Sequence, residues 1–140
     1  MIHSMKLYAS PFDKISSSKK TVELRLYDVK RRKINVGDRI VFSNIDEEDK
    51  KIAVTVKALY RYASFKELFE EIPIEKCGNS SDMTIDEVVE GLRTYYSEEE
   101  EKQYGVLGIK IELADLQQVM KEMEELAMAE YEHYFPDGMK

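Results

Sequence analysis

Lys19-Lys20-Thr21-Val22-Glu23-Leu24-Arg25-Leu26-Tyr27, followed by Val36-Gly37-Asp38 and the apolar run Ile40-Val41-Phe42, is the stretch that decides the predicted fold. Its first part alternates between apolar and polar residues, as does a β-strand with one face in a core. The apolar face holds Val22, Leu24 and Leu26. The other face holds Thr21, Glu23, Arg25 and Tyr27, and Lys19 and Lys20 stand at the strand entrance. A carboxylate beside a guanidinium is more polar chemistry than a solvated face requires, so we expect the functional site on this face.

The remaining patterns predict strands and helices in a mixed order. Alternating apolar residues indicate strands at 3–7, 39–43, 52–62 and 106–113. Three times a Ser or Thr precedes a Glu by three residues, which is the capping-box signal for helices at 65–72, from 85 to 92 and from 98 to Gly105. A short helix is predicted near Pro11, and 28–35 is a basic connection. This order predicts an α+β fold, a small mixed β-barrel flanked by helices.

The last predicted element is an amphipathic helix from Asp115 to Tyr134 that ends before Pro136-Asp137-Gly138. Its apolar stripe needs a partner. A stripe rich in methionine is more often packed core than a surface for a foreign ligand, so we favour packing on this chain or on a second copy. The pattern leaves both open, and a homodimer through this helix is one of the two.

Charge is distributed unevenly along the chain, whose net charge is −7. Between Lys14 and Arg39 there are nine Lys and Arg against three acidic residues, whereas from Glu98 onward there are twelve acidic residues against four Lys. The region of the expected site is therefore locally basic and suits a ligand that carries phosphate. The run from Lys30 to Lys33, taken by itself, is typical of a solvated loop.

Composition excludes several kinds of site. The chain has one cysteine, Cys77, and two histidines, His3 and His133, so we expect no internal disulfide, no metal site built from thiolate or imidazole, and no cofactor. Residues 1–10 lack a signal-peptide pattern, and no apolar run approaches the roughly 18 residues of a membrane span. We therefore expect a cytoplasmic protein that does not contact a membrane.

The motif K-T-x-E-x-R after a short helix, then V-G-D and a hydrophobic strand, resembles the ASCH (activating signal cointegrator homology) family, a branch of the PUA-like β-barrels. A bacterial subgroup of single-domain ASCH proteins is similar in its downstream blocks, here Tyr60-Arg61-Tyr62, Ser64-Phe65, Leu68-Phe69, Tyr95-Tyr96-Ser97 and Tyr104-Gly105-Val106. The resemblance predicts an ASCH domain at 1–113 and a helical extension at 114–140. The chain departs from the family motif at one nearby position: many members have Gly where Ser18 stands.

The resemblance implies a protein that binds RNA, a nucleotide or a nucleoside in a basic cleft along the K-T-x-E-x-R strand. In this hypothesis the cations contact phosphate, Glu23 accepts a hydrogen bond from a base edge, and a tyrosine stacks on a base. The expected binding residues are Lys19, Lys20, Thr21, Glu23, Arg25, Arg31, Arg32, Tyr95 and Tyr96.

Two alternatives belong to other classes of function. Some small bacterial relatives are amidohydrolases that deacetylate N4-acetylcytidine with a lysine, a threonine and a glutamate. Lys20 matches the lysine, but Glu23 stands at the place of the threonine, and Ser81-Asp82 stands where the glutamate is expected. If the chain is an enzyme, Lys20 is the base and Glu23 orients it. The other alternative is a protein-interaction module that uses the C-terminal helix.

Overall fold

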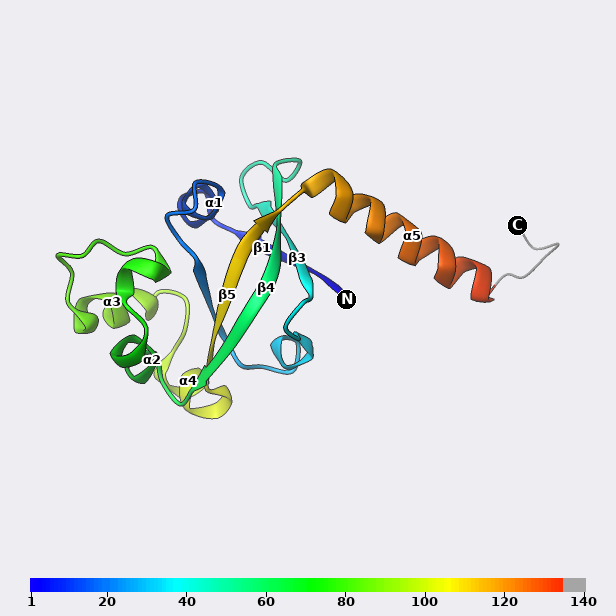
Figure 1. Cartoon of the computed structure of the whole chain (residues 1–140). Coiled ribbons are helices and arrows are strands. Elements are labelled where there is room, and N and C mark those ends of the chain that lie inside the picture. Colours follow the sequence, from blue (N-terminus) through cyan, green and yellow to red (C-terminus); the bar gives the residue numbers. More distant parts are fainter. Residues whose placement is uncertain (135–140) are drawn as a thin grey trace.

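A single five-stranded sheet forms the centre of the protein, whose residues 1–134 are described by the computed structural model (Figure 1). The strands are β1 (Ile2–Leu7), β2 (Val22–Leu26), β3 (Arg39–Asn44), β4 (Lys51–Tyr62) and β5 (Val106–Ala114). They lie in the order β1-β3-β4-β5-β2. β1 runs parallel to β3, and the other neighbours are antiparallel. The sheet curls into a half-barrel, and its two edge strands are β1 and β2.

Within residues 1–134, five α-helices and two short 3₁₀ helices accompany the sheet: α1 (Ala9–Ser16), η1 (Arg31–Lys33), α2 (Phe65–Glu71), η2 (Ile74–Cys77), α3 (Ile85–Leu92), α4 (Glu98–Tyr104) and α5 (Leu116–Tyr134). Complete capping boxes begin α3 at Thr84 and α4 at Ser97. At α2 the Ser64 hydroxyl accepts from the Glu67 amide, but the Glu67 carboxylate accepts from Ala63 instead. The predicted α+β fold is confirmed, with α1 beginning two residues before Pro11.

Both faces of β2 are covered. Val22, Leu24 and Leu26 belong to a core that β2 shares with α2, α3 and η2, as predicted for the apolar face. The other face turns toward the inside of the half-barrel, where Tyr27 packs against a second core that includes Phe12, Ile40, Phe42 and Leu107. Glu23 is consequently 3% exposed. The polar face of this strand is thus a buried surface and not a solvated one.

Only the first part of α5 packs on the sheet. Val119 is fully buried with Val41 and Ala53, while Met120 and Met123 are partly buried there. From Glu124 to Tyr134 the side chains are exposed, and the helix extends away from the body (Figure 1). Packing on the same chain is therefore found for the start of the stripe, and a homodimer through the remainder stays a prediction.

Two further expectations concern the described helices and the C-terminus. No helix within residues 1–134 is both long and apolar enough to cross a membrane. The helix stop that we predicted at Pro136-Asp137-Gly138 lies outside the described residues.

Ser18 joins α1 to the strand entrance in a left-handed conformation, with φ of +62°, the one positive φ of a non-glycine residue within 1–134. The Ser18 amide donates to the Ile15 carbonyl at 3.0 Å, and the Lys19 and Lys20 amides both donate to the Lys14 carbonyl, at 2.8 and 3.0 Å. This tight turn directs Lys20 toward β2. A glycine at this position would be free of strain, because a Cβ is unfavourable in the left-handed region.

We expect Ser18→Gly to raise the free energy of unfolding by about 0.5–1 kcal/mol, because it removes the left-handed strain. Urea denaturation measures the change. The matched control is Ser16→Gly in the last turn of α1, which should lower stability by about the same amount, since glycine is unfavourable in a helix. A loss of stability in Ser18→Gly would show that the serine is not strained.

Candidate functional site

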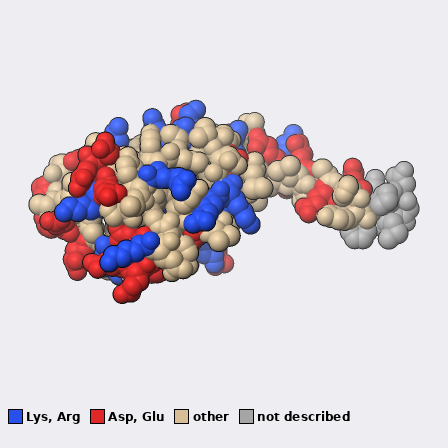
Figure 2. Space-filling model, turned by 90° about the horizontal axis from the view of Figure 1, so that it is seen from below, with Lys and Arg blue, Asp and Glu red and all other residues tan. Residues whose placement is uncertain are grey.

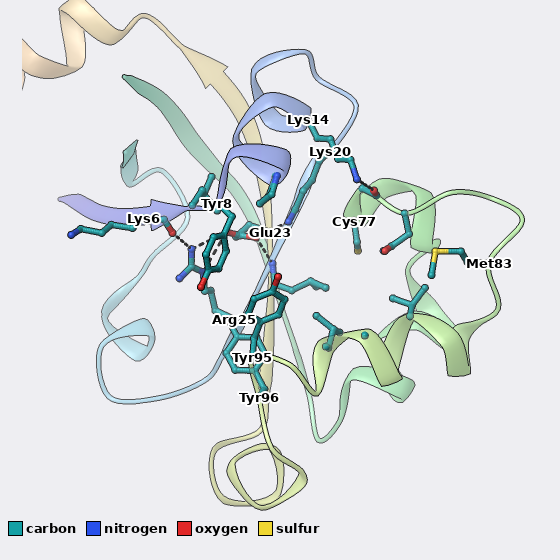
Figure 3. A pocket seen from close by; sticks show the side chains of 18 of the residues that line it. Lys6, Tyr8, Lys14, Lys20, Glu23, Arg25, Cys77, Met83, Tyr95 and Tyr96 are labelled. Carbon is teal, nitrogen blue, oxygen red and sulfur yellow. Dashed lines mark hydrogen bonds and ion pairs between the residues drawn. The ribbon is translucent and has the colours of Figure 1, made fainter. Parts of the chain in front are cut away.

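A cavity of about 550 Å³ opens beside β2, between the start of α1, the end of η2 and α3 (Figure 3). Its volume is in the range of small-molecule sites. Apolar side chains, among them Leu7, Leu24 and Leu92, form part of the lining. The polar and aromatic lining consists mainly of Lys6, Tyr8, Lys14, Lys20, Glu23, Arg25, Tyr95 and Tyr96. The cavity therefore combines four cations, the buried carboxylate of Glu23, the exposed carboxylate of Glu87 and three tyrosines.

Glu23 is the centre of the polar lining, and its carboxylate accepts four hydrogen bonds. Oε1 accepts from Lys20 Nζ at 2.9 Å and from the Leu24 amide at 3.0 Å. Oε2 accepts from Arg25 Nη2 at 3.0 Å and from Arg25 Nε at 3.3 Å. A carboxylate has about four acceptor positions, so none is left for the base edge that the sequence-based hypothesis assigned to it. The role of Glu23 in the structure is to hold Lys20 and Arg25.

The charge state of Glu23 follows from the same contacts. Burial by itself raises the pKa of this carboxyl, but the charges of Lys20 and Arg25 and the hydrogen bonds from Lys20 and Leu24 outweigh it. The net result is a pKa of Glu23 below its ordinary value. Glu23 is therefore an anion at neutral pH.

Arg25 also joins the two edges of the half-barrel. Its Nη2 donates to the carbonyl oxygen of Lys6 at 2.9 Å. Lys6 lies in β1 and Arg25 in β2, and these strands are the opposite edges of the sheet. The Arg25 side chain therefore connects the two edge strands, which are not paired with each other by backbone hydrogen bonds.

Lys20 reaches Glu23 over a glycine. Gly78 ends η2 with φ of +91°, and a Cβ at this position would lie 3.2 Å from Lys20 Cδ. The Gly78 carbonyl accepts from Lys14 Nζ at 2.8 Å. Glycine is thus required both by the backbone conformation and by the lysine stem that passes it. Sequence reasoning missed Gly78 and Lys14; Gly-Asn is a turn signal, but it does not reveal what packs on the turn.

The predicted tyrosine pair divides into two roles. Tyr95 is half-exposed at the cavity mouth, where its ring lies 5.5 Å from the ring of Tyr8, a residue that the sequence did not single out. Tyr96 instead packs on Phe65 at 5.5 Å between centroids, and burial raises the pKa of its phenol. Tyr95 therefore presents an accessible ring, and Tyr96 is a wall of the cavity.

Four of the expected site residues do not line the cavity. Lys19 is exposed, and Thr21 ties the strand to its neighbours through its backbone, donating to Lys76 and accepting from Ile111, each at 2.9 Å. Arg31 pairs with Asp28 at 3.1 Å, and Arg32 lies over the Tyr27 ring. The structure thus brings together Lys20, Glu23, Arg25, Tyr95 and Tyr96 and places Lys19, Thr21, Arg31 and Arg32 elsewhere.

Metal and thiol chemistry find little support in this cavity. Within the part of the chain that the structure describes, no group of three or more His, Cys, Asp or Glu could hold a metal ion. Cys77 lines the cavity, but burial raises the pKa of its thiol to about 12. Cys77 is therefore a protonated wall residue at neutral pH and a poor nucleophile.

Glu23→Gln removes the charge and keeps the shape. We expect the free energy of unfolding to fall by about 1–3 kcal/mol at pH 7, because two poorly exposed cations lose their counter-ion. The folded-state pKa of Glu23 is lowered from 4.5, so its contribution is present above about pH 4.5 and is lost as the pH falls further. Urea denaturation from pH 7 to pH 3 should show the gap to the parent closing. The exposed Glu70→Gln is the control, and a pH-independent gap would contradict the assignment.

Comparison with known proteins identifies the family. The model of the ASCH domain matches residues 5–115. The solved structure of hypothetical protein PH0355 is 41% identical, covers 81% of this chain and 100% of that chain, and has a TM-score of 0.72. Protein PF0455 from Pyrococcus furiosus is 39% identical, covers 82% of this chain and 99% of that chain, and has a TM-score of 0.66. ASCH from Zymomonas mobilis, at 16% identity, 84% and 76% coverage and a TM-score of 0.54, shares the fold. A search of curated proteins gave no match. The chain belongs to the ASCH domain family.

Proposed function

We propose that the cavity beside β2 binds single-stranded RNA or a nucleotide. The observation that carries this proposal is the convergence of Lys20 and Arg25 on one buried carboxylate at the wall of an open cavity of about 550 Å³. Both cations are held in place before any ligand arrives. Such pre-organisation lowers the cost of ordering side chains on binding.

Both cations keep donors for a ligand. An ammonium has three N–H groups, and Lys20 uses one of them on Glu23. A guanidinium has five, and Arg25 uses Nε once and Nη2 twice, on Glu23 and Lys6, so that Nη1 makes no hydrogen bond within residues 1–134. These remaining donors suit the oxygens of a phosphate, which charged donors bind strongly.

The mouth of the cavity suits a base. Tyr8 and Tyr95 are 53% and 55% exposed. Stacking of a base on an aromatic ring contributes about 1–3 kcal/mol and tolerates any base, whereas a base inside a duplex is not available for it. A phosphate on Lys20 and Arg25 with a base on Tyr95 is therefore the arrangement that we assign to a single-stranded ligand.

Lys20→Ala and Arg25→Ala should each weaken binding of single-stranded RNA about tenfold and reduce the magnitude of the salt slope of the affinity by about one, because each removes a phosphate contact. Fluorescence anisotropy over a salt titration measures both quantities. Lys19→Ala is the matched control, since it removes an adjacent, exposed cation that does not line the cavity. Binding by both variants like that of the parent would refute the proposal.

The second candidate function is hydrolysis of a modified nucleoside, which the position of Lys20 favours: its side chain is 10% exposed and faces the cavity next to a carboxylate. A lysine base must be a neutral amine, however, and here Nζ donates to an anionic Glu23. Neither Ser81 nor Asp82 lines the cavity, and Asp82 accepts from Ser80. The place of the family's glutamate is therefore not filled from this segment.

An assay for hydrolysis of N4-acetylcytidine distinguishes between the two functions. We expect no release of cytidine above background by the purified protein, measured by chromatography, because Lys20 Nζ is held in an ion pair with Glu23 and neither Ser81 nor Asp82 lines the cavity. Turnover that Lys20→Ala abolishes and Lys19→Ala leaves intact would establish the hydrolase and overturn the binder as the principal function.

A further inference from the structure

A second hollow, of about 430 Å³, lies where β4 ends and β5 begins, at the lower end of the sheet in Figure 1. Tyr27, Arg61, Tyr62, Tyr104 and Gly105 are among its lining residues. None of the residues that line it also lines the cavity beside β2. It is therefore a separate site, and neither the resemblance nor the proposed function above assigns it a role.

Two guanidinium groups are held on the ring of Tyr27. The Cζ of Arg61 lies 4.0 Å from the ring centroid, and that of Arg32 lies 5.3 Å away. Arg32 Nε also donates to the Tyr27 carbonyl at 3.3 Å. A cation within about 6 Å of an aromatic face is attracted by it. The ring therefore positions both cations without a carboxylate.

Neither of these two arginines is held by an ion pair in the part of the chain that the structure describes. Within residues 1–134, arginine ion pairs are formed by Arg25, Arg31, Arg39 and Arg93, and by neither Arg32 nor Arg61. Most arginine N–H donors of the pair are accordingly open to a ligand. A guanidinium that an aromatic ring supports offers its plane to a base and its edge to a phosphate.

The surroundings reinforce the positive potential. Lys30 and Lys33 flank Arg32 and are exposed. Figure 2 shows Lys and Arg side chains over the central part of the face seen from below, with many acidic side chains toward its left-hand end and along α5. The four glutamates of α4 lie in its first turn, whereas its last residue, Tyr104, lines the hollow. No acidic residue is among those that line the hollow.

The hollow lies close to the cavity along the chain, because Arg25 lines the cavity and Tyr27 lines the hollow. Tyr27 directly follows β2 and stands two residues after Arg25, which is about 7 Å along an extended chain. A separation of this size is of the order of one nucleotide along an extended strand.

We propose that the Arg61–Tyr27–Arg32 stack binds the phosphate and base of a second nucleotide, so that the ligand is a single-stranded oligonucleotide that contacts both hollows at once. This inference rests on the proposed function, because it takes the cavity as the first nucleotide site. It also predicts a preference for longer ligands, because an oligonucleotide makes contacts that a mononucleotide does not reach.

The test compares Arg61→Ala with the parent on two probes, a nucleoside monophosphate and a hexanucleotide of single-stranded RNA, over a salt titration. We expect the affinity for the hexanucleotide to fall about tenfold and the magnitude of its salt slope to fall by about one, with the affinity for the monophosphate unchanged. Lys57→Ala is the matched control, since it removes another exposed cation of β4 that does not line the hollow. Arg61→Lys should restore the salt slope but only part of the affinity, because it keeps the charge and loses the plane.

The outcomes separate this inference from the function on which it rests. If Arg61→Ala leaves the hexanucleotide unaffected, or weakens both probes equally, the second nucleotide site is overturned and the cavity site stands. If neither probe binds the parent protein, both are overturned. Hexanucleotide binding that Arg61→Ala abolishes but Lys20→Ala and Arg25→Ala leave intact overturns the joint occupancy and the cavity, and leaves the hollow as an independent site.

Discussion

The buried carboxylate of Glu23 is the constraint on which the rest of this structure depends. Taking a carboxylate out of water costs several kcal/mol unless charges and hydrogen bonds compensate it, and here Lys20, Arg25 and the Leu24 amide provide that compensation. The compensation has structural consequences. Arg25 reaches Lys6 and links the two free edges of the half-barrel, and Lys20 is drawn across Gly78, which fixes the end of η2 against β2.

The same network explains how an acidic chain has a basic site. Two cations share one carboxylate at the cavity wall, and Lys14 adds a third cation, whose Nζ is bound to a neutral carbonyl. Much of the negative charge lies in the first turn of α4 and along α5, which do not line the cavity, whereas the exposed Glu87 in the first turn of α3 does line it. The potential that a ligand meets depends on charges within about 10 Å, since salt screens more distant ones. Net charge over the whole chain is therefore a poor guide to its ligands.

The periodicity of the sequence predicted the helices and strands themselves better than it predicted which of them pack against one another. Alternation showed which residues of β2 share a face, but it did not show that α2 and α3 cover one face and the half-barrel encloses the other. The parallel pairing of β1 with β3 has no local signal, because β2 and α1 intervene along the chain. Similarly, Lys19 and Lys20 are neighbouring residues of the same type. Because side chains alternate at the strand entrance, Lys19 is exposed whereas most of the Lys20 side chain is buried. Gly78 and Tyr8 were missed because their roles depend on contacts that are distant in sequence.

The two ways in which this protein positions a cation differ physically. Lys20 and Arg25 are 10% and 15% exposed and tied to a carboxylate, so their geometry is fixed and salt screens them weakly. Arg32 and Arg61 are exposed and held by a ring, so their attraction for phosphate is more strongly screened. In the proposed complex, contacts of the first kind would determine where the ligand sits, and contacts of the second kind would add affinity that depends on ionic strength. One strand, β2, with the tyrosine that follows it, supplies the anchor for both, which is why its short polar face holds the centre of the proposed function.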